Sequence, residues 1–200
     1  MTTTFTSVQE EIRHKLAQRR KLQISDPGWI PASVLIALFE KEGRTYVVFT
    51  RRTQIVEHHK GQICFPGGGC EAGETKLNTA LRESFEEIGL RPEDVEVLGE
   101  LDDTRTVTSN FIVSPFVAHI PYPYEFHPSS FEIDAMILLP LDELRNPVNW
   151  RTEVCELGDG TKGEVYFVEV DGAAVWGATA KILKQLVEIL GETKSEAGSR

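Results

Sequence analysis

The stretch from Gly68 to Leu90, GGCEAGETKLNTALRESFEEIGL, constrains the fold more than any other part of the chain. Thr75 is a suitable N-cap and Gly89 a suitable left-handed C-terminal residue, so the sequence predicts a helix over Thr75 to Ile88. At about 100° per residue, four apolar residues fall on one side of this helix and three acids fall on the other. The apolar residues are Leu77, Leu81, Phe85 and Ile88, and the acids are Glu83, Glu86 and Glu87. We therefore expect one face to pack on a core while the other presents a dense group of carboxylates.

Such a group of acids needs a physical explanation, because three carboxylates on little more than one turn repel each other. A divalent cation removes the conflict, since Mg²⁺ and Mn²⁺ prefer oxygen ligands. Arg82 stands four residues before Glu86 and can pair with it. On its own, E-x-x-E-E is usually a solvated helix face. The full pattern, however, fixes the residue type at seven positions with set spacing. With each type at about 6% of residues, a chance match is on the order of 10⁻⁹ per starting position.

This pattern, which runs G-x₅-E-x₇-R-E-x₂-E-E-x-G from Gly68 to Gly89, is the Nudix box, and the chain resembles a Nudix hydrolase. Ser84 stands where an aliphatic residue is common, and we expect a variation in packing there. The resemblance covers the chain from about Ala32 to Leu190. It implies an α+β fold, an α/β/α sandwich with a mixed central sheet and the box on a loop-helix-loop. Residues 1–31 are expected to form an N-terminal helix and lead-in of the same domain, 32–190 the Nudix domain, and 191–200 a disordered tail.

The remaining apolar patterns predict elements that fit this fold. A hairpin is expected from an apolar run and a β-rich run on either side of Gly43, and Pro115 suggests a strand near an edge or bulge. A long loop is expected over Pro121 to Ser130, and such loops are often functional. The predicted strands are Ala32–Phe39, Thr45–Thr50, Val95–Leu101, Phe111–Ile120, Ile133–Leu139 and Glu164–Val170, and the predicted helices besides that of the box are Val8–Lys21, Leu141–Arg145 and Val175–Leu190.

Composition narrows the class of partner. The formal net charge of −10 argues against binding nucleic acid or an anionic membrane, which needs a basic surface, but a metal can still bring a small polyanion to an acidic site. No apolar run approaches the roughly 20 residues that span a bilayer, and the first residues lack a signal-peptide core. The odd number of cysteines, Cys64, Cys70 and Cys155, fits free thiols in a reducing compartment. We expect a cytoplasmic enzyme, and the resemblance implies a possible homodimer.

The resemblance also implies roles for individual residues. Glu83, Glu86 and Glu87, with the carbonyl of Gly68 or Gly69, would hold Mg²⁺ or Mn²⁺. Arg82 would orient the acids, and either one of them or the downstream Glu132 would take a proton from the attacking water. Glu74 is expected to shape the loop and the start of the helix.

Residues outside the box bear on the substrate. The segment Arg51–Gln62 is locally basic, which favours phosphate binding over a role in loop solubility, and the expected substrate-binding residues are Arg52, His59, Lys60, Gly67 and Gly68. The matching residues Thr50, Arg52, Gly61 and Phe65-Pro66-Gly67-Gly68 are similar to the signature of the coenzyme A pyrophosphatase branch, with departures at Thr53 and Glu57.

A later stretch, Val175-Trp176-Gly177-Ala178-Thr179-Ala180, also looks like that branch. The segment from Glu132 to Pro140-Leu141 looks familial too, although Ala135 stands where its second acid is usual. The expected reaction is hydrolysis of coenzyme A or a derivative to 3′,5′-ADP and 4′-phosphopantetheine. Two alternatives remain. One is another Nudix activity, on ADP-ribose, a dinucleotide or a nucleoside triphosphate. The other is a non-catalytic domain that senses a nucleotide.

Overall fold

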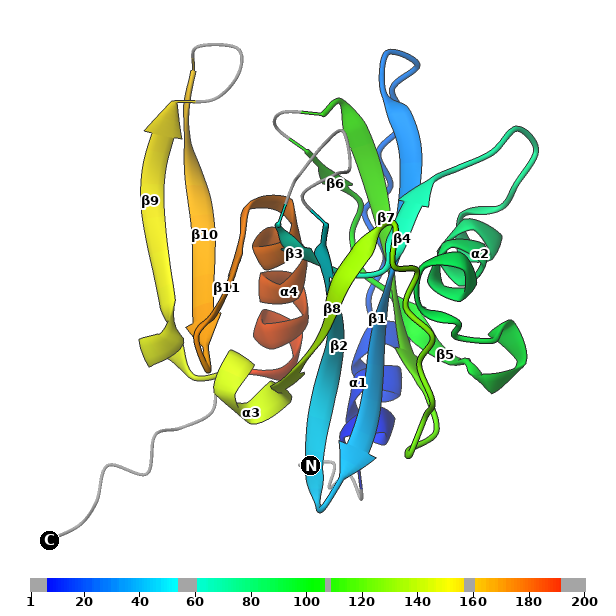
Figure 1. The fold of residues 1–200 in the computed structure, drawn as a ribbon. Coiled ribbons are helices and arrows are strands. Elements are labelled where there is room, and N and C mark those ends of the chain that lie inside the picture. Colours follow the sequence, from blue (N-terminus) through cyan, green and yellow to red (C-terminus); the bar gives the residue numbers. More distant parts are fainter. Residues whose placement is uncertain (1–6, 54–60, 107–108, 157–160, 192–200) are drawn as a thin grey trace, which may run out of the picture.

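A mixed sheet of eight strands forms the centre of the computed structural model, which describes residues 7–53, 61–106, 109–156 and 161–191 (Figure 1). The main path of the sheet runs β3-β2-β1-β7-β5, with β4, β6 and β8 paired to strands of this path. Its strands are β1 (Ile30–Lys41), β2 (Arg44–Arg52), β3 (Ile63–Cys64), β4 (Gly67–Gly69), β5 (Glu96–Glu100), β6 (Thr104–Arg105), β7 (Phe111–His119) and β8 (Ile133–Pro140).

A smaller antiparallel sheet and four α-helices complete the described part of the chain. The smaller sheet has the order β11-β10-β9. Its strands are β9 (Trp150–Glu156), β10 (Lys162–Val170) and β11 (Ala173–Trp176), the helices are α1 (Val8–Ala17), α2 (Lys76–Ile88), α3 (Leu141–Leu144) and α4 (Gly177–Leu190), and short 3₁₀ turns cover Pro92–Asp94 and Pro147–Asn149. None of the helices in these described ranges is long and apolar enough to cross a membrane.

The predicted hairpin and the mixed sheet are confirmed. β1 and β2 pair antiparallel, with Phe39 opposite Tyr46, around a turn in which Glu42 and Gly43 have positive φ. β1 pairs parallel with β7 on its other edge. Antiparallel and parallel neighbours therefore share one sheet, as expected for the α+β class.

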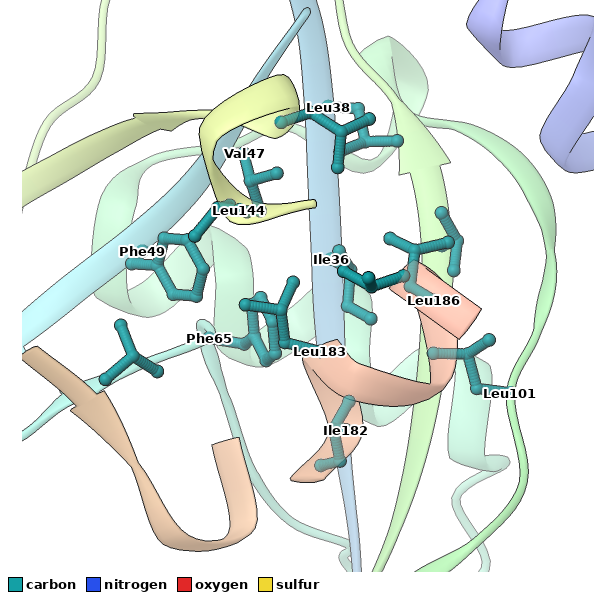
Figure 2. Packing of buried hydrophobic residues seen from close by; sticks show 14 of the residues in the cluster. Ile36, Leu38, Val47, Phe49, Phe65, Leu101, Leu144, Ile182, Leu183 and Leu186 are labelled. Carbon is teal, nitrogen blue, oxygen red and sulfur yellow. The ribbon is translucent and has the colours of Figure 1, made fainter. Parts of the chain in front are cut away.

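Two hydrophobic cores lie on opposite faces of the central sheet. The first core packs α1 and α4 against one face, and Figure 2 shows Ile36 and Phe49 of the sheet in one cluster with Leu183 and Leu186 of α4. The second core packs the other face against α2, through Leu35, Ala80 and Ile88 among others. Alternate residues of β1 supply the two cores, because successive side chains of a strand point to opposite faces. The helix of the box is thus fixed on one face of a sheet that is buried on both.

Helix α1 ends at Ala17 and not at Lys21 as predicted. The basic residues at its end reach acids instead of continuing the helix: Arg19 pairs with Asp102 at 2.6 Å, and Lys21 pairs with the buried Asp103 at 3.0 Å. These contacts hold the lead-in segment against the sheet.

Pro115 does not mark an edge strand, because β7 lies between β1 on one side and β5 and β6 on the other. Its partner strand changes there: β5 pairs up to Phe116 and β6 pairs from Val113. The carbonyl of Pro115 accepts from the amide of Leu101 at 3.0 Å on that side. The missing N–H of the proline therefore falls in the gap between two strands, where the irregular pairing tolerates it.

The sequence prediction missed β9 and placed the start of the last helix too early. β9 is exposed at most of its positions, so it carries none of the apolar alternation that marks a half-buried strand. Val175 and Trp176, predicted as helix, complete β11, and α4 begins at Gly177.

Candidate active site

The box helix forms as its caps predict. The hydroxyl of Thr75 accepts from the amide of Asn78 at 3.2 Å, and Gly89, at φ 70°, donates its amide to the carbonyl of Phe85 at 2.9 Å. β4 precedes the helix and pairs antiparallel with β1, so that Gly68 lies opposite Ser33. The loop-helix-loop is therefore anchored at both ends.

The predicted division of this helix into an apolar face and an acidic face is wrong for two residues. Phe85 is 52% exposed, whereas Glu87 is only 2% exposed. Ser84 is fully buried and donates its hydroxyl to the carbonyl of Ala80 at 2.7 Å. The helix turns its 80, 84, 87 and 88 positions inward because β4 gives Glu87 a backbone partner, the amide of Gly67 at 3.1 Å.

Arg82 organises the exposed side of the site. Its Nη1 donates to Glu83 at 2.8 Å and to Glu86 at 3.0 Å, which confirms the expected pairing with Glu86. Its Nε donates to Glu74 at 3.0 Å, and its Nη2 donates to the carbonyl of Gly69 at 3.1 Å. These hydrogen bonds raise the pKa of Arg82, and the bonds from Arg82 lower the pKa of Glu74 to about 2. One guanidinium thus fixes two carboxylates of the helix and one of the preceding loop.

Glu74 belongs to this loop and not to the group of Glu83, Glu86 and Glu87. Besides Arg82, it accepts the hydroxyl of Thr79 at 2.7 Å and the amide of Glu71 at 3.1 Å. A carboxylate with partners from the loop and from the first turn of the helix has the position expected of a residue that shapes both.

Close packing between β4 and the helix requires glycine at two positions. A Cβ on Gly68 would lie 2.5 Å from the carboxyl carbon of Glu83. A Cβ on Gly67, which has φ +150°, would lie 2.3 Å from the carbonyl oxygen of Ser33. The glycines therefore let the backbone of β4 approach the acids.

We expect Gly68→Ala to lower turnover by a factor on the order of 10 to 100, because the new methyl group must displace the Glu83 carboxylate and small misplacements of catalytic groups are costly. Gly69→Ala is the matched control, since a Cβ there has no atom within 4 Å. Steady-state kinetics of the two variants checks this. Equal turnover in both would show that the close approach at Gly68 has no part in the reaction.

Glu87, Arg52 and Glu132 form the inner part of the site. The Nη1 of Arg52 lies 3.4 Å from Glu87, and its Nη2 lies 3.9 Å from Glu132. Burial raises the pKa of Glu87 to about 7, although the Gly67 amide and Arg52 act in the opposite direction. Burial also raises the pKa of Glu83. The site therefore combines exposed, half-buried and buried carboxylates around two arginines, Arg52 and Arg82.

The loop after β7 brings Glu132 to this place. The amides of His127 and Ser129 donate to the carbonyls of Ile88 and Glu87 at 2.9 and 2.8 Å, which caps the end of α2. The amide of Thr53 donates to the carbonyl of Glu132 at 2.8 Å. These contacts were not predicted from the sequence, in which the length of the loop from Pro121 to Ser130 is the one signal of a functional role.

The structure thus brings together eight of the ten residues that the sequence places in the site. These are Arg52, Gly67, Gly68, Arg82, Glu83, Glu86, Glu87 and Glu132. His59 and Lys60, together with Glu57, lie outside the described residues. Cys64, Cys70 and Cys155 are free thiols, as expected.

The donor set suits a hard divalent cation. It consists of carboxylate oxygens and backbone carbonyls, and the Gly68 backbone is close enough to Glu83 that no side chain fits between them. In this conformation Arg82 pairs with Glu83 and Glu86, and within the described ranges no three acidic, histidine or cysteine side chains converge on one point. The residues fit the chemistry of Mg²⁺ or Mn²⁺, and binding would exchange the contacts of Arg82 for contacts with the ion.

Comparison with known proteins decides the family. Residues 29–154, more than half of the chain, match the NUDIX domain family. The chain belongs to the Nudix hydrolase family. Hydrolases of this family use divalent metal ions.

Several relatives of this Nudix hydrolase show how far the similarity extends. Nudix hydrolase 3 of Caenorhabditis elegans is 41% identical over 115 residues, 56% of this chain and 48% of that protein, so the chain spans about half of this relative. The uncharacterized Nudix hydrolase NudL of Citrobacter koseri is 34% identical over 162 residues, 80% of this chain and 82% of that protein. The peroxisomal coenzyme A diphosphatase NUDT7 of Mus musculus is 32% identical over 128 residues, which cover 63% of this chain and 54% of that protein.

A solved structure supports the fold alone. The MutT/nudix family protein from Enterococcus faecalis is 16% identical and superposes with a TM-score of 0.53. The superposition covers 94% of this chain and 81% of that protein's chain. The α+β architecture with a mixed sheet is therefore that of the family.

Proposed function

We propose that this Nudix hydrolase cleaves a diphosphate that joins a nucleoside to another moiety, and that its substrate is coenzyme A or a derivative. The products would be 3′,5′-ADP and 4′-phosphopantetheine. The observation that carries the reaction type is the gathering of Glu83, Glu86, Glu87 and Arg82 against the glycines of β4. The substrate rests on the segment from Thr50 to Gly68, and similarity to a relative named as a coenzyme A diphosphatase supports it.

In the proposed mechanism, Glu83, Glu86 and Glu87, with the carbonyl of Gly68, would hold Mg²⁺ or Mn²⁺. When bound, such an ion would supply neutralisation of charge on the diphosphate and a lower pKa for the attacking water. Arg82 keeps Glu83 and Glu86 in fixed rotamers through hydrogen bonds of 2.8 and 3.0 Å. The β4 backbone, which is held in place by pairing with β1, lies against the acids and limits how close a substrate can come to them.

One carboxylate must take the proton of the attacking water. Glu87 and Glu132 both lie beside Arg52, which can hold either carboxylate in position. General-base assistance of this kind contributes about 10² to 10⁴ in rate. We assign the proton to a carboxylate of the acid group or to Glu132, and single Gln substitutions compared by their pH–rate profiles separate these residues.

The position of Arg52 favours a role close to the diphosphate. Its guanidinium lies among the acids, and its Nε is buried with no hydrogen-bond partner in the described residues. A phosphate oxygen supplies the acceptor that this nitrogen lacks. From the sequence, both Arg52 and Lys60 are candidates for a distal phosphate such as the 3′-phosphate of coenzyme A, and the position of Arg52 among the acids leaves this role to Lys60.

We expect Arg52→Ala to lower kcat/KM by about 10- to 100-fold, equally for coenzyme A and dephospho-coenzyme A, because a charge-assisted hydrogen bond near the reacting group is lost. Lys60→Ala should weaken coenzyme A hydrolysis alone. Arg51→Ala is the control, since Arg51 pairs with Asp134 at 2.8 Å and not with the glutamates of the site. Equal loss with both substrates in Lys60→Ala would remove Lys60 from the distal phosphate site.

A substrate panel tests the proposal as a whole. Coenzyme A, ADP-ribose, NADH, diadenosine polyphosphates and nucleoside triphosphates are incubated with the enzyme, with Mg²⁺ or with EDTA, and the products are identified by mass. We expect metal-dependent release of 3′,5′-ADP and 4′-phosphopantetheine from coenzyme A at the highest kcat/KM of the panel. Faster cleavage of another compound would move the assignment to that substrate, and no cleavage of any would favour a nucleotide-sensing domain.

The homodimer and the cytoplasmic location expected from the sequence stay predictions. Sedimentation equilibrium checks the first, and imaging of the tagged full chain checks the second.

A further inference from the structure

Three planar groups form a row across the smaller sheet. Arg151 on β9 and Trp176 on β11 are both direct cross-strand partners of Phe167 on β10. The guanidinium carbon of Arg151 lies 4.3 Å from the centroid of the Phe167 ring, and the Trp176 ring stacks on Phe167 at 6.2 Å and an interplanar angle of 17°. Because β9 and β11 flank β10 on opposite sides, Arg151 and Trp176 cover opposite faces of the Phe167 ring.

The row ends at Trp176 with a free ring face. Trp176 is 43% exposed, and within the described parts of the chain Phe167 is the one ring that stacks on it. An exposed, stacked tryptophan is unusual, since this residue normally buries most of its large surface. It also lies in the Val175–Ala180 stretch, to which the proposed catalytic chemistry gives no role. A flat apolar surface is therefore held in a defined orientation by two neighbouring strands.

The free face of Trp176 lies on the catalytic side of the molecule. Val175 and Ile63 are buried in the core that contains α4, so Trp176 and Cys64, their neighbours in β11 and β3, point to the opposite side. β3 and β11 lie next to each other (Figure 1). β3 therefore stands between Trp176 and the group of acids.

The neighbours of Cys64 connect this side to the acids. The Sγ of Cys64 lies 3.4 Å from the hydroxyl of Thr50. Arg52, two residues further along β2, points to the same side as Thr50 and reaches Glu87. The row Arg151–Phe167–Trp176 thus approaches the site along the surface, with Trp176 as its nearest member.

We propose that the free face of Trp176 stacks on the purine base of the nucleotide substrate, as the fourth planar group of the row. This inference rests on the proposed function, and it assigns the base-binding position that the acids and Arg52 do not supply. A purine matches an indole in shape, planarity and π-character, and base–aromatic stacking needs no specific hydrogen bonds. The net charge of −10 disfavours a nucleic-acid strand as the occupant, so the ligand is a free nucleotide.

The test compares Trp176→Ala with Trp176→Phe and with Val154→Ala. Phenylalanine retains a stacking surface, and Val154 is an exposed apolar residue of the same sheet, 69% exposed, on its other face. Binding of 3′,5′-ADP is measured by calorimetry, and ribose 5-phosphate serves as a probe without a base. We expect Trp176→Ala to weaken 3′,5′-ADP binding by about tenfold or more. Trp176→Phe should lose no more than about threefold, Val154→Ala nothing, and ribose 5-phosphate should bind all variants alike.

Kinetics give an independent measurement. In Trp176→Ala, KM for the base-containing substrate should rise about tenfold while kcat stays within about twofold, because stacking is distant from the reacting phosphorus. Stacking should also quench the fluorescence of Trp176 in the parent protein.

The outcomes separate the two proposals. Unchanged 3′,5′-ADP binding in Trp176→Ala overturns the stacking site even if the diphosphatase reaction is observed. Equal weakening of ribose 5-phosphate binding shows a general structural role for Trp176 and also overturns it. A parent protein that neither binds 3′,5′-ADP nor cleaves any adenine-containing diphosphate overturns the proposed function together with this inference.

Discussion

Replacing Glu86 by glutamine is expected to lower kcat by about two orders of magnitude or more while the fold stays intact. The carboxylate of Glu86 is 56% exposed and accepts a hydrogen bond from Arg82 at 3.0 Å. Glutamine keeps the shape and can still accept this bond, but it removes the negative charge with which a divalent cation would pair. The measurement is single-turnover kinetics at saturating Mg²⁺, with the free energy of unfolding from urea titration beside it.

Glu93→Gln is the matched control for this variant, because Glu93 is an exposed glutamate just beyond the box helix. Both substitutions should change the free energy of unfolding by no more than about 0.5 kcal/mol. Titration with Mn²⁺ should show weaker binding in Glu86→Gln alone. Turnover within threefold of the parent would remove Glu86 from the metal site.

The stability of the metal-free protein is expected to fall as pH rises, through Glu87. Burial raises the pKa of Glu87 from 4.5 to about 7. Below pH 4.5 this residue is protonated in both the folded and the unfolded state. Between pH 4.5 and 7 the folded protein retains a proton that the unfolded chain has lost, so the free energy of unfolding decreases with pH. The difference between the two pKa values corresponds to roughly 3 kcal/mol, fully lost above pH 7.

Urea titrations in EDTA at pH 5 and pH 8 check this prediction. Glu87→Gln cannot ionise, so its loss of stability between these pH values should be smaller than that of the parent by roughly 2.5 kcal/mol. Glu153→Gln, an exposed glutamate on β9, should follow the parent. The same pH dependence in Glu87→Gln and in the parent would contradict a buried, protonated Glu87. Added Mg²⁺ should restore much of the stability at pH 8 in the parent and in Glu153→Gln but not in Glu87→Gln, because a bound cation favours the ionised carboxylate.

The box helix and the hairpin could be predicted from sequence because their signals are local. The N-cap Thr75, the left-handed Gly89 and the turn at Gly43 each fix the backbone within a few residues. The pairing of Arg82 with Glu86 follows from helical spacing alone and was also predicted correctly.

The burial of each acidic side chain could not be predicted, because it depends on contacts between segments that are distant in the sequence. Helical periodicity treats Glu87 as polar and Phe85 as apolar, yet Glu87 is buried and Phe85 is exposed. The amide of Gly67, twenty residues away, is the contact that overrides the pattern. In the same way, β9 was missed because its partner strand, and not its own composition, makes it a strand.

The capping of α2 by the loop after β7 has a consequence for how sequences of this kind can vary. His127 and Ser129 contribute backbone amides, so their side chains can change freely while the hydrogen bonds to Ile88 and Glu87 persist. An inserted or deleted residue between Ser129 and Ile133, by contrast, would shift Glu132 relative to Arg52. Natural variation in loop length should therefore concentrate before His127, where added or deleted residues would change the length of the loop without moving Glu132 or the acids of α2.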